Sequence, residues 1–187
     1  IWYQRRDRAQ ERLDLIHVDW PGTGNRKTVV VETDPFWLEP VDDFHLLDDG
    51  SLLWPSRRFG HRHLLRITSH GTATDLTPGP WDVTELIGVD PLGEYAWYQA
   101  ARPNALERRI YRIEIAGGET VELTPAAGTH SGLLSPSKDR LLVTSSSVGA
   151  APRRRVTNGR ERGGTEVPVE DPMPGIGLAE HRFVEIP

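Results

Sequence analysis

Residues 83–124 read VTELIGVDPLGEYAWYQAARPNALERRIYRIEIAGGETVELT, and this stretch decides the fold. It holds four short runs of β-forming residues, at 83–89, 95–100, 109–115 and 120–123. Turn formers such as Pro91-Leu92-Gly93 and Gly117-Gly118 separate these runs. Four antiparallel strands in a unit of this length are typical of a propeller blade. We therefore expect residues 83–124 to form one blade.

The same pattern recurs along the chain. Trp2-Tyr3-Gln4 returns as Trp97-Tyr98-Gln99, 95 residues later, and Leu15-Ile16-His17-Val18 returns at the same offset as Ile110-Tyr111-Arg112-Ile113. An intermediate copy, Leu64-Leu65-Arg66-Ile67, precedes that last segment by 46 residues. The offset is two repeats of about 47 residues, which is a blade length. The sequence predicts an all-β fold, a partial β-propeller of about three and a half four-stranded antiparallel blades.

The repeat also predicts the order of the segments within residues 1–147. A partial blade occupies 1–33, complete blades occupy 44–77 and 83–124, and a further blade starts at 131–147. Residues 148–178 are rich in Gly, Pro and Arg and predict a loop or a degraded blade, with only 166–169 strand-like. Residues 179–187 alternate polar and apolar side chains and predict a strand that leads into a following domain. Because the chain begins within a strand-like pattern, we expect it to be an internal piece of a longer protein.

Composition excludes several classes of function. Lys and Arg total 22 against 27 Asp and Glu, a net charge of −5, which is the wrong sign for a nucleic-acid binder. The absence of Cys excludes a disulfide framework, a thiolate metal site and a Cys nucleophile. No run approaches the roughly 18 apolar residues of a membrane span. The glycines at 22 and 24 lack the following helix of a phosphate loop, and we expect no cofactor.

Four stretches carry a resemblance to a known family. Residues 51–64 are similar to an aromatic-x-Ser-Glu-x-x-Gly-x-x-His-Leu segment, and residues 80–90 to a Gly-x-Trp-Asp-Val-Thr motif with its following strand. Residues 107–112 are similar to a Glu-x-x-Leu-Tyr strand, and residues 128–136 to a Gly-x-His-Ser-x-x-Phe-Ser-Pro segment. In this order and spacing they resemble the dipeptidyl peptidase IV family of prolyl-oligopeptidase-type serine peptidases.

The resemblance implies a domain organisation and a set of partners. Members of that family have an N-terminal propeller and a C-terminal α/β-hydrolase domain, so this chain resembles the C-terminal part of the propeller. The catalytic Ser, Asp and His are then expected beyond Pro187, and the paired glutamates that hold the substrate amine before Ile1. No catalytic residue is expected in this chain. The implied partners are the α/β-hydrolase domain of the same protein, peptide substrates and a second copy in a homodimer.

Two functions remain open at this point. The first is a non-catalytic propeller segment that forms part of the substrate-chamber wall in a serine exopeptidase releasing N-terminal dipeptides. The alternative is a non-enzymatic propeller that binds a protein or a small ligand, because a fold does not determine a function.

One of the six tryptophans is the candidate substrate-binding residue. Trp37 lies in the link Asp34-Pro35-Phe36-Trp37-Leu38-Glu39-Pro40 between two blades, and by the resemblance it is expected to border the extended substrate site. The other tryptophans are expected to pack between neighbouring sheets, where they bury a large apolar area. These are Trp2, Trp20, Trp54, Trp81 and Trp97.

Three further motifs have a structural and a functional interpretation. His61 and His63 are two residues apart in a predicted strand, so their side chains lie on the same face. No third ligand is evident, so we favour a role in stabilising the blade over a metal site. In residues 128–132, GTHSG, Ser is fourth and not third, so a turn with His130 hydrogen-bonded in the blade is favoured over a nucleophile elbow. The basic run of residues 153–155, with Arg160 and Arg162, either contacts an acidic partner or is solvated.

Overall fold

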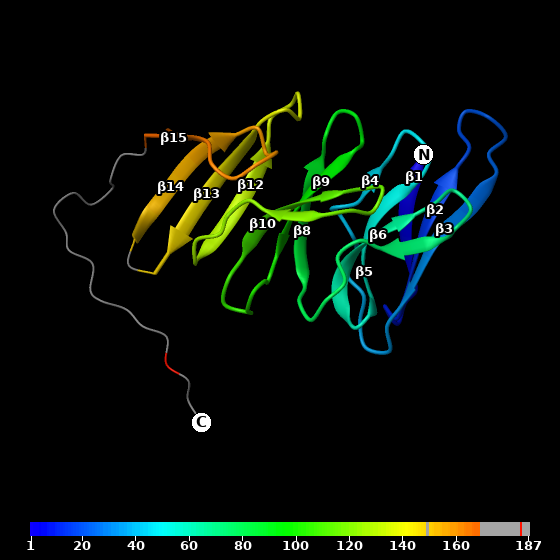
Figure 1. The fold of residues 1–187 in the computed structure, drawn as a ribbon. Coiled ribbons are helices and arrows are strands. Elements are labelled where there is room, and N and C mark those ends of the chain that lie inside the picture. The colour runs from blue at the N-terminus through cyan, green and yellow to red at the C-terminus, as the bar shows by residue number, and fades with distance from the viewer. Residues whose placement is uncertain (149, 169–183, 185–187) are drawn as a thin grey trace. The chain divides into compact units, whose positions relative to one another are not determined.

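The structure is a computed structural model that describes residues 1–148, 150–168 and 184. Within these ranges the chain forms fifteen β-strands, arranged as four antiparallel sheets (Figure 1). The described residues contain no helix that is long and apolar enough to cross a membrane. The chain divides into two compact units, Ile1–Pro80 and Trp81–Pro187, which are treated separately below.

The first unit contains a three-stranded and a four-stranded sheet. The three-stranded sheet has the order β1 (Trp2–Arg6), β2 (Arg12–Val18) and β3 (Arg26–Thr33). The four-stranded sheet has the order β4 (His45–Leu46), β5 (Leu52–Phe59), β6 (His61–Ile67) and β7 (Ala73–Asp75). Every neighbouring pair is antiparallel and consecutive in sequence, as in a propeller blade.

The second unit contains two four-stranded sheets. One consists of β8 (Val83–Val89), β9 (Tyr95–Ala100), β10 (Arg109–Glu114) and β11 (Thr120–Glu122). The other consists of β12 (Thr129–Leu134), β13 (Leu141–Ser147), β14 (Ala150–Thr157) and β15 (Thr165–Val167). These sheets have the same consecutive antiparallel order, so the predicted all-β class is confirmed in both units.

The last sheet is more complete than the sequence predicts. Ala150–Thr157 is a strand of eight residues in the segment that we expected to be a loop or a degraded blade. It pairs with β13 from Leu141↔Thr157 to Ser145↔Arg153, with a bulge before Ser147. The ladder uses main-chain N–H and C=O groups, which an Arg residue has like any other non-proline residue. Most of the strand is exposed and so lacks alternating hydrophobicity. Residues 169–178, and the predicted strand at 179–187 apart from Val184, lie outside the described residues.

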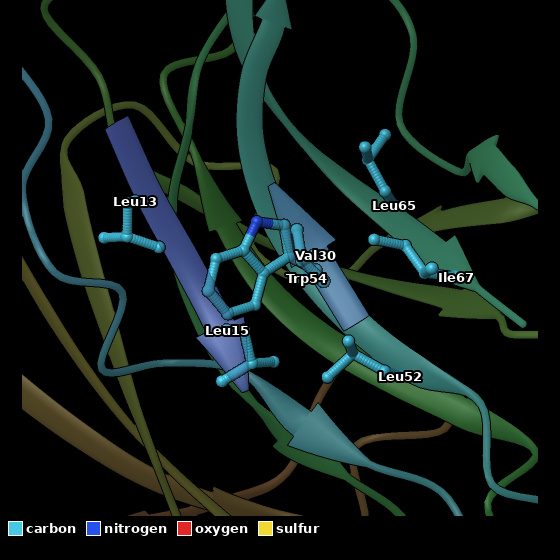
Figure 2. Packing of buried hydrophobic residues seen from close by; sticks show 7 residues of the cluster. All are labelled: Leu13, Leu15, Val30, Leu52, Trp54, Leu65 and Ile67. Carbon is cyan, nitrogen blue, oxygen red and sulfur yellow. The ribbon is translucent and has the colours of Figure 1, made fainter. Parts of the chain in front are cut away.

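The core of the first unit forms between its two sheets. Trp54 is fully buried and lies among apolar side chains from β2, β3, β5 and β6 (Figure 2). The surrounding buried residues are Leu13, Leu15, Val30, Leu52, Leu65 and Ile67. The indole Nε1 of Trp54 donates to Oε1 of the buried Glu32 at 2.9 Å, so its polar group is satisfied.

The second unit has its own core around Trp97. Its other buried members are Ile110, Leu123, Leu141 and Val143, and the Trp97 Nε1 donates to the Gly159 carbonyl at 2.8 Å. The expected burial of tryptophans is therefore confirmed for Trp54 and Trp97. For Trp20 it is wrong, because Trp20 lies beyond the last paired residues of the β2–β3 hairpin, Val18 and Arg26, and is 66% exposed.

The repeated Trp-Tyr-Gln sequence has a common structural use. The side-chain amide of Gln4 donates to the Val41 carbonyl at 2.7 Å and accepts from the Val41 amide at 2.9 Å. The amide of Gln99 donates to the His130 carbonyl at 2.6 Å. In the first unit the glutamine thus ties its sheet to the link that leads into the next sheet, and in the second unit it ties its sheet to the first strand of the next.

Candidate functional site

The Trp37 link connects β3 to β4 and presents two aromatic side chains to solvent. Trp37 is 54% exposed and Phe36 is 87% exposed. The Asp34 carboxylate accepts from the backbone amides of Phe36 at 2.8 Å and of Trp37 at 3.2 Å. Such a turn restricts the backbone at the points where the two aromatic side chains leave it.

The turn between β1 and β2 supports this link from the neighbouring part of the unit. The Gln10 carbonyl accepts from the Leu38 amide at 2.8 Å, and the Gln10 side-chain Oε1 accepts from the Trp37 indole. Arg6 donates to the same Oε1 at 2.9 Å and to the Leu38 carbonyl at 2.8 Å. The indole is therefore held at its nitrogen, while more than half of its surface stays accessible.

The start of the link is fixed by a buried carboxylate. Glu32, near the end of β3, accepts from the Trp54 indole, from the Ser56 hydroxyl at 3.0 Å and from the Arg58 guanidinium. This network joins β3 to the hairpin between β5 and β6, whose tip carries Phe59, 60% exposed. Both ends of the chain around Trp37 are thus anchored to β-structure.

This surface combines exposed aromatic rings with guanidinium groups that are already paired. It offers exposed aromatic rings for apolar contact and stacking, and its guanidinium groups at Arg6 and Arg58 already have acceptors. Trp37 is the sequence candidate, and the structure places Phe36, Arg6 and Gln10 beside it. Phe36 carried a signal, since an aromatic residue next to Trp37 in a Pro-flanked link has little to pack against, whereas Arg6 and Gln10 carried none.

The histidines of β6 do not form a metal site in the described part of the chain. The rings of His61 and His63 have centroids 6.2 Å apart, and no group of three His, Cys, Asp or Glu that could hold a metal ion occurs within the described ranges. His63 is buried, and its Nδ1 has no hydrogen-bond partner there.

His130 lies inside β12 and is hydrogen-bonded in its blade, as the sequence predicted. Its Nδ1 is 2.8 Å from the Ser145 hydroxyl on β13, and its Nε2 is 2.8 Å from the Ala126 carbonyl. Because a carbonyl only accepts, Nε2 carries the proton and Nδ1 accepts from Ser145. Burial lowers the pKa of His130, and the nearby charges of Arg155 and Arg109 lower it further. The GTHSG segment is therefore strand and not a nucleophile elbow.

Comparison with known proteins gives a family-model match and a similar crystal structure. The family model described as the dipeptidyl peptidase IV (DPP IV) N-terminal region matches residues 1–152. The crystal structure of Porphyromonas gingivalis dipeptidyl peptidase 4 resembles 83% of this chain with a TM-score of 0.75 and 23% sequence identity. This chain covers 22% of that chain, so it spans about a fifth of its length. At this identity the likeness establishes the fold, which is that of a partial β-propeller.

Proposed function

Because this chain belongs to the dipeptidyl peptidase IV family, as part of its N-terminal region, we propose that it is a non-catalytic propeller segment of a serine exopeptidase. The exopeptidase releases N-terminal dipeptides, and the segment forms part of the wall of its substrate chamber. The observation that carries the proposal is the family match over residues 1–152. The nucleophile and its Asp and His partners belong to an α/β-hydrolase domain of the same protein.

A chamber wall contributes to such a reaction by positioning. Enclosure restricts entry to slender, extended peptides and holds the substrate so that the bond two residues from its amino terminus meets the nucleophile. Restricting the bound geometry in this way lowers the entropic part of the barrier without any reacting group on the wall.

Within this function, Trp37 contacts the peptide substrate. Its exposure supports the proposal, as does the way in which Asp34 and Gln10 hold it. An aromatic side chain that is already held in place loses little conformational entropy when a ligand packs against it.

The function is tested by release of p-nitroaniline from Gly-Pro-p-nitroanilide. The 187-residue chain is compared with a longer protein that contains it together with the hydrolase domain. We expect release by the longer protein alone and complete inhibition by a fluorophosphonate, which reacts with an activated serine. Release by the 187-residue chain would overturn the proposal. Inactivity of both proteins would favour the alternative, a non-enzymatic propeller that binds a protein or a small ligand.

The role of Trp37 is tested in the longer protein by Trp37→Ala. We expect KM to rise about 5- to 30-fold with little change in kcat, which corresponds to about 1–2 kcal/mol of lost substrate binding. Trp20→Ala is the matched control, because Trp20 is also an exposed tryptophan but lies in the β2–β3 hairpin. Equal effects of the two substitutions would contradict the assignment of Trp37.

A further inference from the structure

A groove with a volume of about 400 Å³ opens in the second unit. One side is the link between β11 and β12, residues 124–127, and the other is the β13–β14 hairpin with Arg153, Arg154 and Arg155 of β14. His130 and Ser145 line the groove between these two sides. We call it the β14 groove.

Within the described residues, the arginines of the β14 groove lack acidic partners. Arg153 and Arg154 are exposed, and their side chains form no hydrogen bond or ion pair with any described residue. Arg155 donates through Nη2 to the Leu123 carbonyl at 2.7 Å, but its buried Nε has no partner in the described part of the chain. Other arginines, such as Arg12, Arg62 and Arg109, are paired with carboxylates.

The local charge of the groove is positive although the chain is acidic overall. Among the described residues, three arginines and one glutamate, Glu166, line it, which is an excess of two positive charges in a chain of net charge −5. Glu166 pairs with Arg155 in the strand register but forms no ion pair within the described ranges. Burial lowers the pKa of His130 and so disfavours its positively charged form. Attraction of an acidic ligand must therefore come from the groove itself and not from the field of the whole chain.

The lining indicates what kind of ligand fits. The two sides carry small apolar residues, Pro125, Ala126 and Ala127 on the link and Ala150 and Ala151 on the hairpin, which suit contact with an extended backbone. A planar guanidinium binds a carboxylate through two parallel hydrogen bonds, and clusters of Arg recognise acidic motifs. The volume exceeds what a single small ion requires.

We propose that the β14 groove binds an extended acidic peptide segment, whose carboxylates pair with Arg153 and Arg155. These two arginines are two residues apart on β14 and so lie on the same face as Ser145. The link residues and the hairpin alanines contact its backbone, and the hydroxyl of Ser147 is available as a further donor. This site belongs to the chain itself and does not depend on the proposed exopeptidase function.

The test uses the 187-residue chain and a fluorescein-labelled tetra-glutamate peptide, with binding followed by fluorescence anisotropy at low salt. We expect saturable binding of this peptide and none of a tetra-glutamine peptide. Arg153→Gln combined with Arg155→Gln is expected to weaken binding about tenfold or more. Circular dichroism shows whether the variant retains the β-structure of the parent chain.

A matched control removes the same charge elsewhere. Arg8→Gln combined with Arg160→Gln changes two exposed arginines outside the groove and is expected to leave binding unchanged. Ala151→Glu places a carboxylate on the exposed hairpin side of the groove and is expected to weaken binding while every arginine is retained. This second variant decides the question if the double arginine variant does not fold.

Three results would overturn the proposal. Equal binding of the tetra-glutamine peptide would remove the role of the carboxylates. Equal losses in the groove variant and in the control would show a general effect of charge. Displacement of the peptide by inorganic phosphate, but not by chloride at the same ionic strength, would reduce the groove to a site for small anions.

Discussion

Asp14 shows how a single buried charge stabilises the first unit. Its carboxylate is 2% exposed and accepts from Arg5 at 2.5 Å and from Arg12 at 2.8 Å. Burial alone would raise the pKa of Asp14, but the hydrogen bonds and charges of the two arginines outweigh it and hold the pKa below its usual range. A carboxyl with a lowered pKa stabilises the folded state above its unfolded pKa of about 3.9, and this contribution is lost as the pH falls through the folded value.

We predict that Asp14→Asn lowers the free energy of unfolding at neutral pH by about 1–3 kcal/mol, because two charge-assisted hydrogen bonds are lost. Urea unfolding measures the effect, and the difference from the parent chain is expected to shrink below about pH 4. Asp42→Asn, which removes the same charge at an exposed position, is the control and is expected to change little. A difference that stays constant down to low pH would contradict this account of Asp14.

We expect His130 to make the free energy of unfolding depend on pH for a different reason, because burial disfavours its charged form. Its pKa is lowered in the folded state, so the unfolded chain takes up the proton more readily as the pH falls below about 6.5. The free energy of unfolding is therefore expected to decrease from about pH 7 towards pH 5, and this slope should be smaller in His130→Gln. Urea unfolding at several pH values measures it. Parallel profiles for the parent chain and the variant would show that His130 does not contribute.

At the scale of elements, the recurring glutamine joins consecutive sheets. We predict that Gln99→Ala lowers the free energy of unfolding by about 1–2 kcal/mol, because the bond from Gln99 to the His130 carbonyl is lost. Thr84→Val is the control, since it removes only the bond from the Thr84 hydroxyl to the same side chain. Urea unfolding of both variants measures the two effects, and a larger loss for Thr84→Val would contradict the role of Gln99.

The elements also differ in how far their sequences predict them. Strands β9 and β10 were predictable because both are rich in buried apolar and aromatic residues and turn formers bound them. Strand β14 was not, because its first five residues are all exposed and include Pro152 and two arginines. Its place in the sheet depends on the main-chain groups of β13, which carry no signal in the sequence of β14 itself.

At the scale of the whole molecule, the edge strands of the sheets bear on whether this chain associates with a second copy. The last strand of each four-stranded sheet, namely β7, β11 and β15, lies at a sheet edge and has only three residues. Short edge strands resist the addition of another chain. The 187-residue chain is therefore expected to sediment as a monomer of 21.0 kDa. Sedimentation velocity at several concentrations tests this, and a dimer of the chain itself would place the contact on the propeller segment.

The sequence by itself determined the fold class, the repeat and the candidate Trp37, because strand alternation, turn residues and repeat length are local properties that survive without coordinates. The burial of Trp54 and Trp97 also followed, since large apolar side chains between predicted sheets have few other places to go. Only the tertiary structure decided the exposure of Trp20, the support of Trp37 by Gln10 and Arg6, and the meeting of three arginines with residues 124–127 in one groove. These features join residues that are far apart in sequence or depend on whether a neighbouring sheet is present, and no local pattern encodes either condition.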